Sequence, residues 1–514
     1  MNGAEALIRT AVASGVEVCF ANPGTTEMHL VAALDAAPGM RAVLGLFEGV
    51  VTGAADGYAR MAGKPALTLT HLGPGFANGI ANLHNARRAN SPVVNVIGDQ
   101  ATWHLAADAP LTSDIESLAK PVSIWVRKVK TPAEVGPAMA EAIAASQRAP
   151  GGVATLIVPA DCAWGEAPGA ARPVAIEAAS PARGEAIDAA ARALRAGEPA
   201  LILLGGSALS KRGSLAAARI AAKCGARVMF VTFPARVERG AGMPAFQKFP
   251  YFPEQGVELL GSVRQLVLAG ATEPVAFFGY PNTPSRLTPA GCRISVLAKP
   301  EEDAAGALEA LASALGAGAI EGELAARASL APATGKLTPE TLGRTLAALQ
   351  PAGAVVVDEA ATSGAPWYAF AGGAPPHTYL GLTGGAIGQG LPNAVGAAIA
   401  CPDRRVIALQ ADGSGMYTLQ SLWTAARESL DLKTIICANR MYRILKVELA
   451  RADISQPGPA ARALTDLGKP NLDWVSLARG MGVPGERAET AEDFAAALGR
   501  AFAERGPFLV EAVL

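Results

Sequence analysis

Short apolar runs alternate with stretches of helical period along almost the whole chain. In the first 165 residues, five runs have the length and composition of buried strands: 16–20, 42–46, 66–70, 93–97 and 153–158. Apolar residues recur every three or four positions around and between these runs, which predicts helices over residues 4–14, 49–61, 79–89 and 132–147. Strands that are apolar on both faces are typical of a parallel sheet covered by helices on both sides. The pattern therefore predicts an α/β fold.

The same alternation occurs twice more along the chain. Apolar runs that predict further strands lie at residues 200–204, 227–231, 266–269 and 293–296, and again at 354–358, 406–409, 434–437 and 508–513. The stretches 163–184 and 316–337 are rich in Ala, Pro and Gly and have no clean period, which is typical of linkers. We therefore expect three doubly wound parallel-sheet domains, at residues 1–165, 185–316 and 338–514.

Composition and charge narrow the class of protein. Hydrophobic residues make up 50% of the 514 residues, charged residues 17%, and the net charge is −1. No basic run exceeds two residues, so we expect neither nucleic acid nor an anionic membrane as a partner. The first residues lack the pattern of a signal peptide, and no apolar stretch is long enough to span a membrane. The six scattered cysteines form no C-x-x-C pair, which favours reduced thiols over zinc and a cytoplasmic location.

The strongest chemical pattern is Asp412-Gly413-Ser414, followed by Asn439. Asp412 ends one apolar run and Asn439 ends the next, 439 − 412 = 27 residues later. That spacing fits one strand–helix–strand unit, so both side chains should stand at the carboxyl ends of neighbouring parallel strands. A carboxylate and an amide carbonyl suit Mg²⁺ bound together with phosphates, and a helix opening at Ser414 favours an anion. A helix-capping Asp with an ordinary loop Asn is the alternative for this pattern taken alone.

Two further polar residues follow predicted strands of the first domain. Glu48 precedes a glycine-containing helix, where it could simply interact with the helix dipole, or share a proton with a heterocycle nitrogen if it is buried. His71 precedes Gly73-Pro74-Gly75, which predicts a turn where a ligand can approach the backbone. A hydrogen-bonded structural histidine is the alternative for His71, and we expect His84, inside a helical pattern, to be structural.

Two loops should face the same ends of the sheets. Thr25 lies on the turn signal Asn22-Pro23-Gly24, at the end of the first strand. The glycine-rich stretch 383–390 precedes a helix and would let a planar ligand lie against bare backbone. Gly205-Gly206 lacks the G-x-G-x-x-G pattern, which argues against a Rossmann-type nucleotide enzyme.

Taken together, these residues resemble the thiamine-diphosphate-dependent enzymes of the acetolactate synthase and benzoylformate decarboxylase group. The resemblance covers essentially the whole chain, in the order pyrimidine-binding, middle and diphosphate-binding domain. Ala411 and Ala438 depart from the usual glycine and asparagine of the family pattern, but neither position supplies a metal-binding side chain.

The resemblance implies a role for each matching residue. Asp412, Asn439 and the carbonyl of Met441 would be the Mg²⁺ ligands. Glu48 would pair with the aminopyrimidine of thiamine diphosphate, and His71 and Thr25 would line the substrate pocket. The remaining cofactor contacts would be Gly385, Ile387, Thr362, Gly413, Ser414 and Tyr442.

The implied reaction is decarboxylation of a 2-oxo acid, with carboligation as a further step left open. We do not expect FAD, because the middle domain lacks the flavin motif of acetolactate synthases. Benzoylformate decarboxylases carry a second pocket histidine, whereas this chain has none between His104 and His377. Cleavage of 2-hydroxyacyl-CoA thioesters is an alternative, and an inactive cofactor-binding homologue is an alternative of another class. The resemblance also implies an obligate homodimer, with a homotetramer as the expected assembly.

Overall fold

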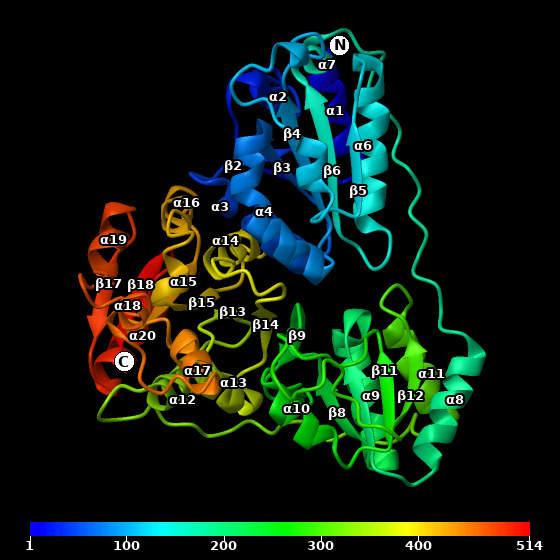
Figure 1. Ribbon diagram of the computed structural model, residues 1–514, viewed down its shortest axis with the longest axis vertical. Coiled ribbons are helices and arrows are strands. Elements are labelled where there is room, and N and C mark those ends of the chain that lie inside the picture. The colour runs from blue at the N-terminus through cyan, green and yellow to red at the C-terminus, as the bar shows by residue number, and fades with distance from the viewer.

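Three β-sheets organise the chain in the computed structural model, which describes residues 1–514 (Figure 1). The first sheet has six parallel strands in the order β2-β1-β3-β4-β6-β5. These strands are β1 (Val18–Asn22), β2 (Arg41–Leu44), β3 (Ala66–His71), β4 (Val93–Asp99), β5 (Trp125–Lys128) and β6 (Val153–Pro159).

Helices cover both faces of the first sheet. Helices α1 and α6 pack on one face, and α3 and α4 pack on the other. The helices of this unit are α1 (Gly3–Ala13), α2 (Met28–Asp35), α3 (Glu48–Ala62), α4 (Leu72–Ala89), α5 (Ile115–Ala119), α6 (Pro132–Gln147) and α7 (Ala160–Trp164). The predicted α/β class is confirmed, since parallel strands dominate all three sheets.

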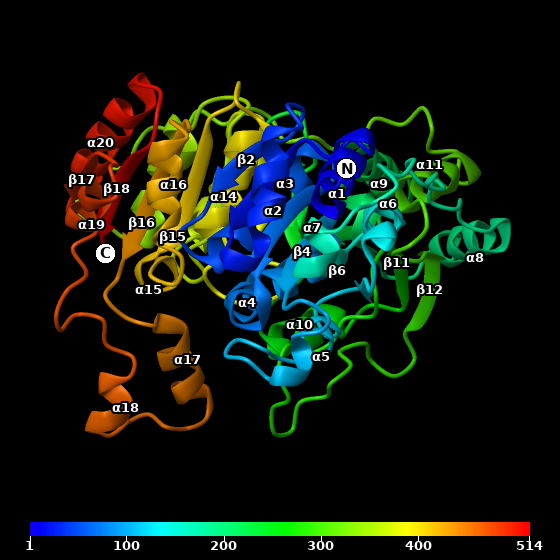
Figure 2. The same ribbon diagram turned by 90° about the horizontal axis from the view of Figure 1, so that it is seen from above.

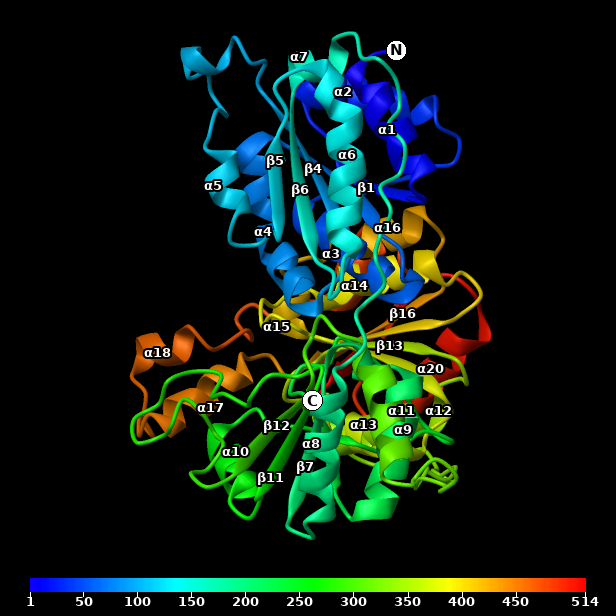
Figure 3. The ribbon, with the colours of Figure 1, turned by 90° about the vertical axis from the view of Figure 1, so that its right-hand side faces the viewer.

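The middle unit contains a five-stranded parallel sheet in the order β10-β8-β7-β11-β12. An extended connection over residues 165–183 leads to it from the first unit (Figures 1 and 3). Its elements are β7 (Ala200–Leu204), β8 (Arg227–Phe230), β10 (Gln247–Lys248), β11 (Gln265–Ala269), β12 (Arg293–Ala298), α8 (Gly184–Arg195), α9 (Lys211–Cys224), α10 (Pro253–Leu260) and α11 (Ala304–Ala314).

The third sheet has seven strands in the order β17-β18-β16-β15-β13-β14-β9. Its strands are β9 (Arg236–Arg239), β13 (Val355–Glu359), β14 (His377–Gly381), β15 (Val406–Ala411), β16 (Leu432–Ala438), β17 (Gly485–Ala488) and β18 (Phe508–Val513). β9 comes from the middle of the chain and pairs antiparallel with β14. The sequence pattern did not predict this strand, because its pairing is fixed by packing between two units.

The helices of the third unit are α12 (Pro339–Leu349), α13 (Ala365–Phe370), α14 (Gly390–Ala400), α15 (Asp412–Gly415), α16 (Ser421–Arg427), α17 (Arg443–Arg451), α18 (Pro459–Ala463), α19 (Trp474–Gly480) and α20 (Ala491–Ala503). Figure 2 shows α17 and α18 projecting from one side of the molecule. No helix of the protein is both long enough and apolar enough to cross a membrane.

Helix α4 begins earlier than the sequence predicts. The expected turn at residues 73–75 is the first turn of this helix, which starts at Leu72. Pro74 is tolerated there because the first backbone N–H groups of a helix have no partner within it. The prediction of a turn was therefore wrong: His71 occupies the N-cap position of this helix, and its side chain forms no capping hydrogen bond.

Glycines allow α3 and α14 to lie in close contact, which joins the first and third units. A Cβ atom on Gly57 would lie 2.1 Å from the carbonyl oxygen of Asn393. A Cβ atom on Gly396 would lie 1.9 Å from the carbonyl oxygen of Ala54. Apolar side chains of both helices enter one core that reaches both sheets.

A buried ion pair lies where the three units meet. The Arg60 guanidinium donates to both carboxylate oxygens of Asp56, at 2.8 and 2.6 Å. It also donates to the carbonyls of Ala235, from the middle unit, and Gly381, from the third. Ser91 also donates to Asp56. Every polar atom of this pair has at least one hydrogen-bond partner, which offsets the cost of burying two charges.

We expect Asp56→Ala to destabilise the protein by about 3–5 kcal/mol, because it leaves the Arg60 charge buried and unpaired. The control is Glu17→Ala, which removes the exposed partner of Lys64 and should cost less than about 1 kcal/mol. Thermal unfolding of both variants measures the difference. A midpoint for Asp56→Ala as high as that of Glu17→Ala would contradict the role of the pair.

Candidate active site

Asp412 and Asn439 lie at the ends of adjacent strands, as their spacing predicts. β15 ends at Ala411 and β16 ends at Ala438, and the two strands pair in parallel. Asp412 is the first residue of α15, a helix of only four residues, whereas the sequence predicted a helix that opens at Ser414. The two polar side chains therefore share one edge of the third sheet.

Asp412 is only 2% exposed, and its carboxylate forms no ion pair. Burial raises its pKa, while hydrogen bonds from the backbone N–H groups of Arg440 and Gly413 act in the opposite direction. Those bonds measure 2.5 and 2.9 Å. A buried carboxylate held only by amide groups fits a site that a cation completes.

Asn439 lies on the loop that follows β16. Its side-chain oxygen accepts a hydrogen bond of 3.1 Å from the backbone N–H of Met441. The oxygens of Asp412 and Asn439 thus both bond to the backbone of residues 440–441. Hard oxygen donors of this kind are what Mg²⁺ takes when it also binds phosphates. The residues present fit a Mg²⁺–diphosphate group.

Aromatic rings cover two of the glycines near this edge. A Cβ atom on Gly413 would lie 2.5 Å from the ring of Tyr442, and one on Gly388 would lie 2.6 Å from Cβ of Tyr417. These close approaches explain why residues 388 and 413 are glycines.

Thr362, on the loop after β13, is half-buried, and its side chain forms no hydrogen bond.

The glycine-rich loop at residues 383–390 is held by α4 of the same chain. Asn85 accepts from the N–H groups of Gly384 and Ala386, at 3.1 and 3.3 Å, and donates to the carbonyl of Ala386 at 2.7 Å. His84 bonds to the carbonyl of Gly384 at 3.1 Å. The expectation that His84 is structural stays a prediction, but its ring contacts the loop that carries Gly385 and Ile387.

Gly385 has the backbone conformation that a cradle of bare backbone needs. Gly385 has a φ of +81°, which favours glycine, and a Cβ atom there would meet the ring of Phe277 at 2.8 Å. Ile387 is half-buried beside it. Phe277 comes from the middle unit, so that unit also reaches this loop.

Glu359 and Gln410 are residues of this site that the sequence reasoning missed. Glu359 is buried and accepts from the backbone N–H groups of Gly388 and Gly390, both at 2.7 Å. Gln410 donates to Glu359 at 2.6 Å and accepts from the hydroxyl of Ser414, also at 2.6 Å. Glu359, like Glu48, is an acid at the end of an apolar run, and this pattern could have indicated it from the sequence.

Glu48 begins α3 at the edge of the first sheet and is 8% exposed. Asn78 of α4 donates to its carboxylate at 3.0 Å. No side chain or backbone group of the third unit forms a hydrogen bond with this carboxylate. Glu48 is thus a nearly buried acid with unused acceptor capacity.

His71 bonds to a fully buried carboxylate, that of Glu27. The distance from Nδ1 to Oε2 is 2.8 Å, and since a carboxylate only accepts, Nδ1–H is the donor. Thr26 donates to Glu27 at 2.6 Å, and the N–H of Gly24 does so at 2.8 Å. The imidazole is therefore held in one tautomer, with Nε2 left for another partner.

Gly24 leaves room for this imidazole. A Cβ atom on Gly24 would lie 2.2 Å from the ring of His71. Thr25 is exposed and forms no side-chain hydrogen bond, so the hydroxyl that contacts His71 is that of Thr26, at 3.2 Å. The turn predicted at Thr25 is a short 3₁₀ helix, Thr25–Glu27.

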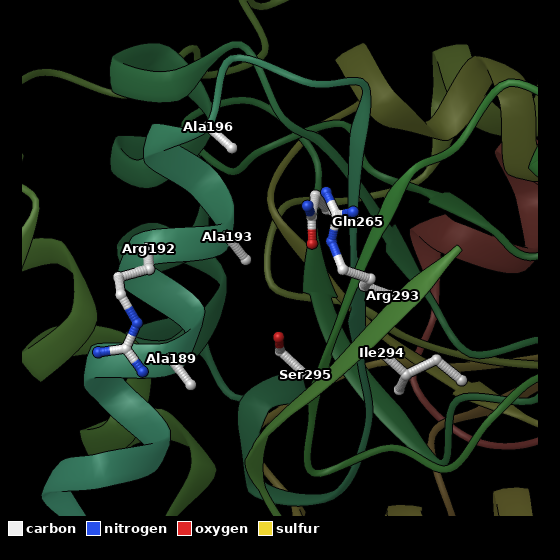
Figure 4. Close-up of a pocket in the computed structure, with 8 residues that line it drawn as sticks. All are labelled: Ala189, Arg192, Ala193, Ala196, Gln265, Arg293, Ile294 and Ser295. Carbon is white, nitrogen blue, oxygen red and sulfur yellow. The ribbon is translucent and has the colours of Figure 1, made fainter. Parts of the chain in front are cut away.

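An open groove in the middle unit lies away from all these residues (Figure 4). It runs between α8 and the edge strand β12. None of the predicted site residues contributes to it. Its lining residues are Ala189, Arg192, Ala193, Ala196, Gln265, Arg293, Ile294 and Ser295.

Sequence comparisons match both ends of the chain to one family. Residues 1–118 match the N-terminal TPP binding domain of thiamine pyrophosphate enzymes, and residues 364–512 match the C-terminal TPP binding domain. The chain belongs to the thiamine pyrophosphate enzyme family. The second match contains Asp412, Asn439 and the glycine-rich loop, and the first contains Glu48 and His71.

Several members of the thiamine pyrophosphate enzyme family resemble the chain over its full length. IlvX of Mycobacterium tuberculosis, whose name assigns it to the acetolactate synthase large subunits, is 53% identical over 100% of this chain and 99% of its own length. The benzoylformate decarboxylase of Pseudomonas aeruginosa is 29% identical over 97% of this chain and 96% of its own. The protein is thus a thiamine-diphosphate-dependent enzyme of the acetolactate synthase and benzoylformate decarboxylase group.

A solved structure of the thiamine pyrophosphate enzyme family gives the same grouping. The thiamine diphosphate-dependent 4-hydroxybenzoylformate decarboxylase of Rhodococcus jostii RHA1 superposes with a TM-score of 0.85 and 26% sequence identity. It covers 100% of this chain and 99% of its own. The fold and the cofactor are therefore those of a thiamine pyrophosphate enzyme.

We expect Glu27→Gln to release the His71 ring, because an amide cannot accept from the imidazole, the Thr26 hydroxyl and the Gly24 N–H as a carboxylate does. With only five histidines in the chain, ¹⁵N-histidine NMR resolves the tautomer. The His71 Nδ1–H signal should be lost or become mobile, while the His84 signal stays unchanged as the internal control. An unchanged His71 signal would contradict the pairing.

Proposed function

We propose that this enzyme decarboxylates a 2-oxo acid with thiamine diphosphate and Mg²⁺. The observation that carries the proposal is the buried Asp412 carboxylate, which has no basic partner and lies beside Asn439 at the ends of two adjacent strands. It lies within the residues that match the C-terminal TPP binding domain. In this proposal residues 1–165, 185–316 and 338–514 are the pyrimidine-binding, middle and diphosphate-binding domains.

The metal end of the proposed site consists of oxygen donors. Asp412, Asn439 and the carbonyl of Met441 hold Mg²⁺, and Ser414 and Thr362 contact the diphosphate. Gly413 and Tyr442 line the same part of the site, where a bare backbone lets phosphates approach. When bound, thiamine diphosphate supplies the carbon nucleophile and the electron sink that the loss of CO₂ needs.

The pyrimidine end of the proposed site combines an acid with a rigid loop. Glu48 would hold a proton for the hydrogen bond that pairs it with the cofactor's heterocycle. Its near-complete burial supports this role, because a dry site strengthens such a hydrogen bond. Gly385 would present its carbonyl to the cofactor, and Ile387 its side chain. The hydrogen bonds from α4 keep this loop rigid.

The substrate end contains His71 and Thr25. The bond from His71 to Glu27 supports a catalytic role, because it fixes the tautomer and leaves Nε2 to bind a carboxylate or move a proton. Burial of the reacting group away from water favours loss of CO₂, since charge is reduced in that step. We propose no FAD, and we propose that Glu48 acts on the cofactor of a partner chain in a homodimer that pairs into a homotetramer.

The first test is cofactor binding by calorimetry with and without Mg²⁺. We expect Asp412→Ala to weaken Mg²⁺-dependent binding of thiamine diphosphate at least about tenfold, because the only charged metal ligand is lost. The matched control is Asp466→Ala, an exposed acid on the bridge opposite Met441, which should bind as the wild type does. Equal affinities of the two variants would refute the metal site.

The reaction is tested on the same preparations with a substrate panel. Pyruvate, benzoylformate, branched 2-oxo acids and a 2-hydroxyacyl-CoA are offered, and CO₂ and products are measured. We expect CO₂ from at least one 2-oxo acid with the wild type and Asp466→Ala, and none above background with Asp412→Ala. Cleavage of the acyl-CoA without CO₂ from any 2-oxo acid would contradict the proposal.

A further inference from the structure

Glu359 is a buried acid at the end of β13 with an unusual set of partners. Its Oε1 atom accepts from the N–H groups of Gly388 and Gln389, at 2.7 and 3.1 Å. Its Oε2 atom accepts from the N–H of Gly390 at 2.7 Å and from the Gln410 side chain at 2.6 Å. One side chain therefore satisfies three successive N–H groups where the glycine-rich loop enters α14.

Only a carboxylate can satisfy this arrangement fully. Both oxygens of Glu359 face two donors each, so an amide or a hydroxyl in their place would turn an N–H or O–H group toward other donors. Burial raises the pKa of Glu359 to about 7, with the bonds from Gln410 and the three N–H groups acting in the opposite direction. The four hydrogen bonds offset the cost of burying this acid.

A chain of hydrogen bonds leads from Glu359 through Gln410 to residues 411–414. Gln410 donates its amide N–H to Glu359 and accepts, through its oxygen, from the N–H of Ala411 at 2.9 Å and the hydroxyl of Ser414 at 2.6 Å. Glu359 and Gln410 thus connect residues 388–390 with residues 411–414. The first set follows Gly385 and Ile387, and the second set contains Asp412.

The opposite side of the glycine-rich loop is held from other elements. Asn82 of α4 and Thr418 both donate to the carbonyl of Gly388, at 3.3 and 2.8 Å. These bonds involve the carbonyl side of the loop, whereas Glu359 binds its N–H groups. No other side chain bonds to the N–H groups of residues 388–390.

We propose that Glu359 is a positioning residue that, through Gln410, fixes the glycine-rich loop and the Asp412–Ser414 turn relative to each other, and so shapes the cofactor site before the cofactor binds. The part that concerns the cofactor rests on the proposed function. The part that concerns the two loops does not, because the hydrogen bonds lie entirely within this chain.

The test replaces Glu359 by Gln, which keeps its size, and follows two quantities. Hydrogen exchange of the cofactor-free protein, read in peptides that cover residues 384–392 and 410–416, should be at least about tenfold faster in Glu359→Gln, because buried N–H groups lose their acceptor. The dissociation constant of thiamine diphosphate with Mg²⁺ should rise at least about tenfold for the same reason.

The control is Asp358→Asn, which changes the preceding acid on the same strand. Asp358 accepts a hydrogen bond of 3.1 Å from the N–H of Ala360 and lies near Tyr379 and Lys248, but it forms no hydrogen bond with residues 384–392 or 410–416. This variant can lower the thermal midpoint, but exchange in both peptides should match that of the wild type. The comparison separates positioning of the loops from a general loss of stability.

A second variant keeps the proposal testable if Glu359→Gln fails to fold. Gln410→Met removes the bonds of Gln410 to Glu359, Ala411 and Ser414 but leaves the three N–H groups of residues 388–390 bonded to Glu359. Exchange should therefore rise in residues 410–416 but not in 384–392, and cofactor affinity should fall. The proposal would be overturned by exchange in Glu359→Gln that is no faster than in Asp358→Asn. It would also be overturned if exchange in residues 410–416 of Gln410→Met equalled that of the wild type. A wild type that binds no thiamine diphosphate would refute the proposed function and leave the exchange comparison valid.

Discussion

The close contact between α3 and α14 is the constraint on which the candidate site depends. Gly57 and Gly396 let the two helices approach until backbone touches backbone, and any side chain there would push the units apart. Because α4 packs beside α3, this contact also brings Asn82 and Asn85 to the glycine-rich loop. A loop of bare backbone would otherwise lose order, since glycine gains the most freedom when it is released.

Three buried acids near the strand ends have their charges satisfied in different ways. Glu27 is surrounded by the His71 ring, a hydroxyl and one N–H group. Glu359 is surrounded by three N–H groups and the amide of Gln410. Asp412 has only two N–H groups and the raised pKa that follows from burial. Of the three, Asp412 is the one whose surroundings best suit an added cation.

The sequence predicted the strands that carry these residues better than it predicted their partners. Asp412 and Asn439 could be assigned to adjacent strand ends because hydrophobic runs and a 27-residue spacing depend on local pattern. Glu27 lies two residues after Thr25 and was missed, because no spacing rule tells which side chain of a short 3₁₀ helix turns inward.

Other predictions from the sequence failed for similar reasons. The strand predicted at residues 354–358 ended one residue before Glu359, so the acid was lost at an uncertain boundary. The glycines and proline after His71 predicted a turn, although a proline in the first turn of a helix costs little. β9 depends on pairing with a strand about 140 positions away, for which the sequence has no local pattern.

In the proposed dimer, Glu48 and Asp412 of one chain belong to different active sites, because each site takes its acid from one chain and its metal ligands from the other. Co-expression of Glu48→Gln and Asp412→Ala chains with different affinity tags isolates the mixed dimer, and CO₂ release from the best 2-oxo acid measures its activity. Each variant alone should be inactive, whereas the mixed dimer should regain about half of the wild-type rate, since one of its two sites keeps both residues. An inactive mixed dimer, with both variants folded, would contradict the shared site.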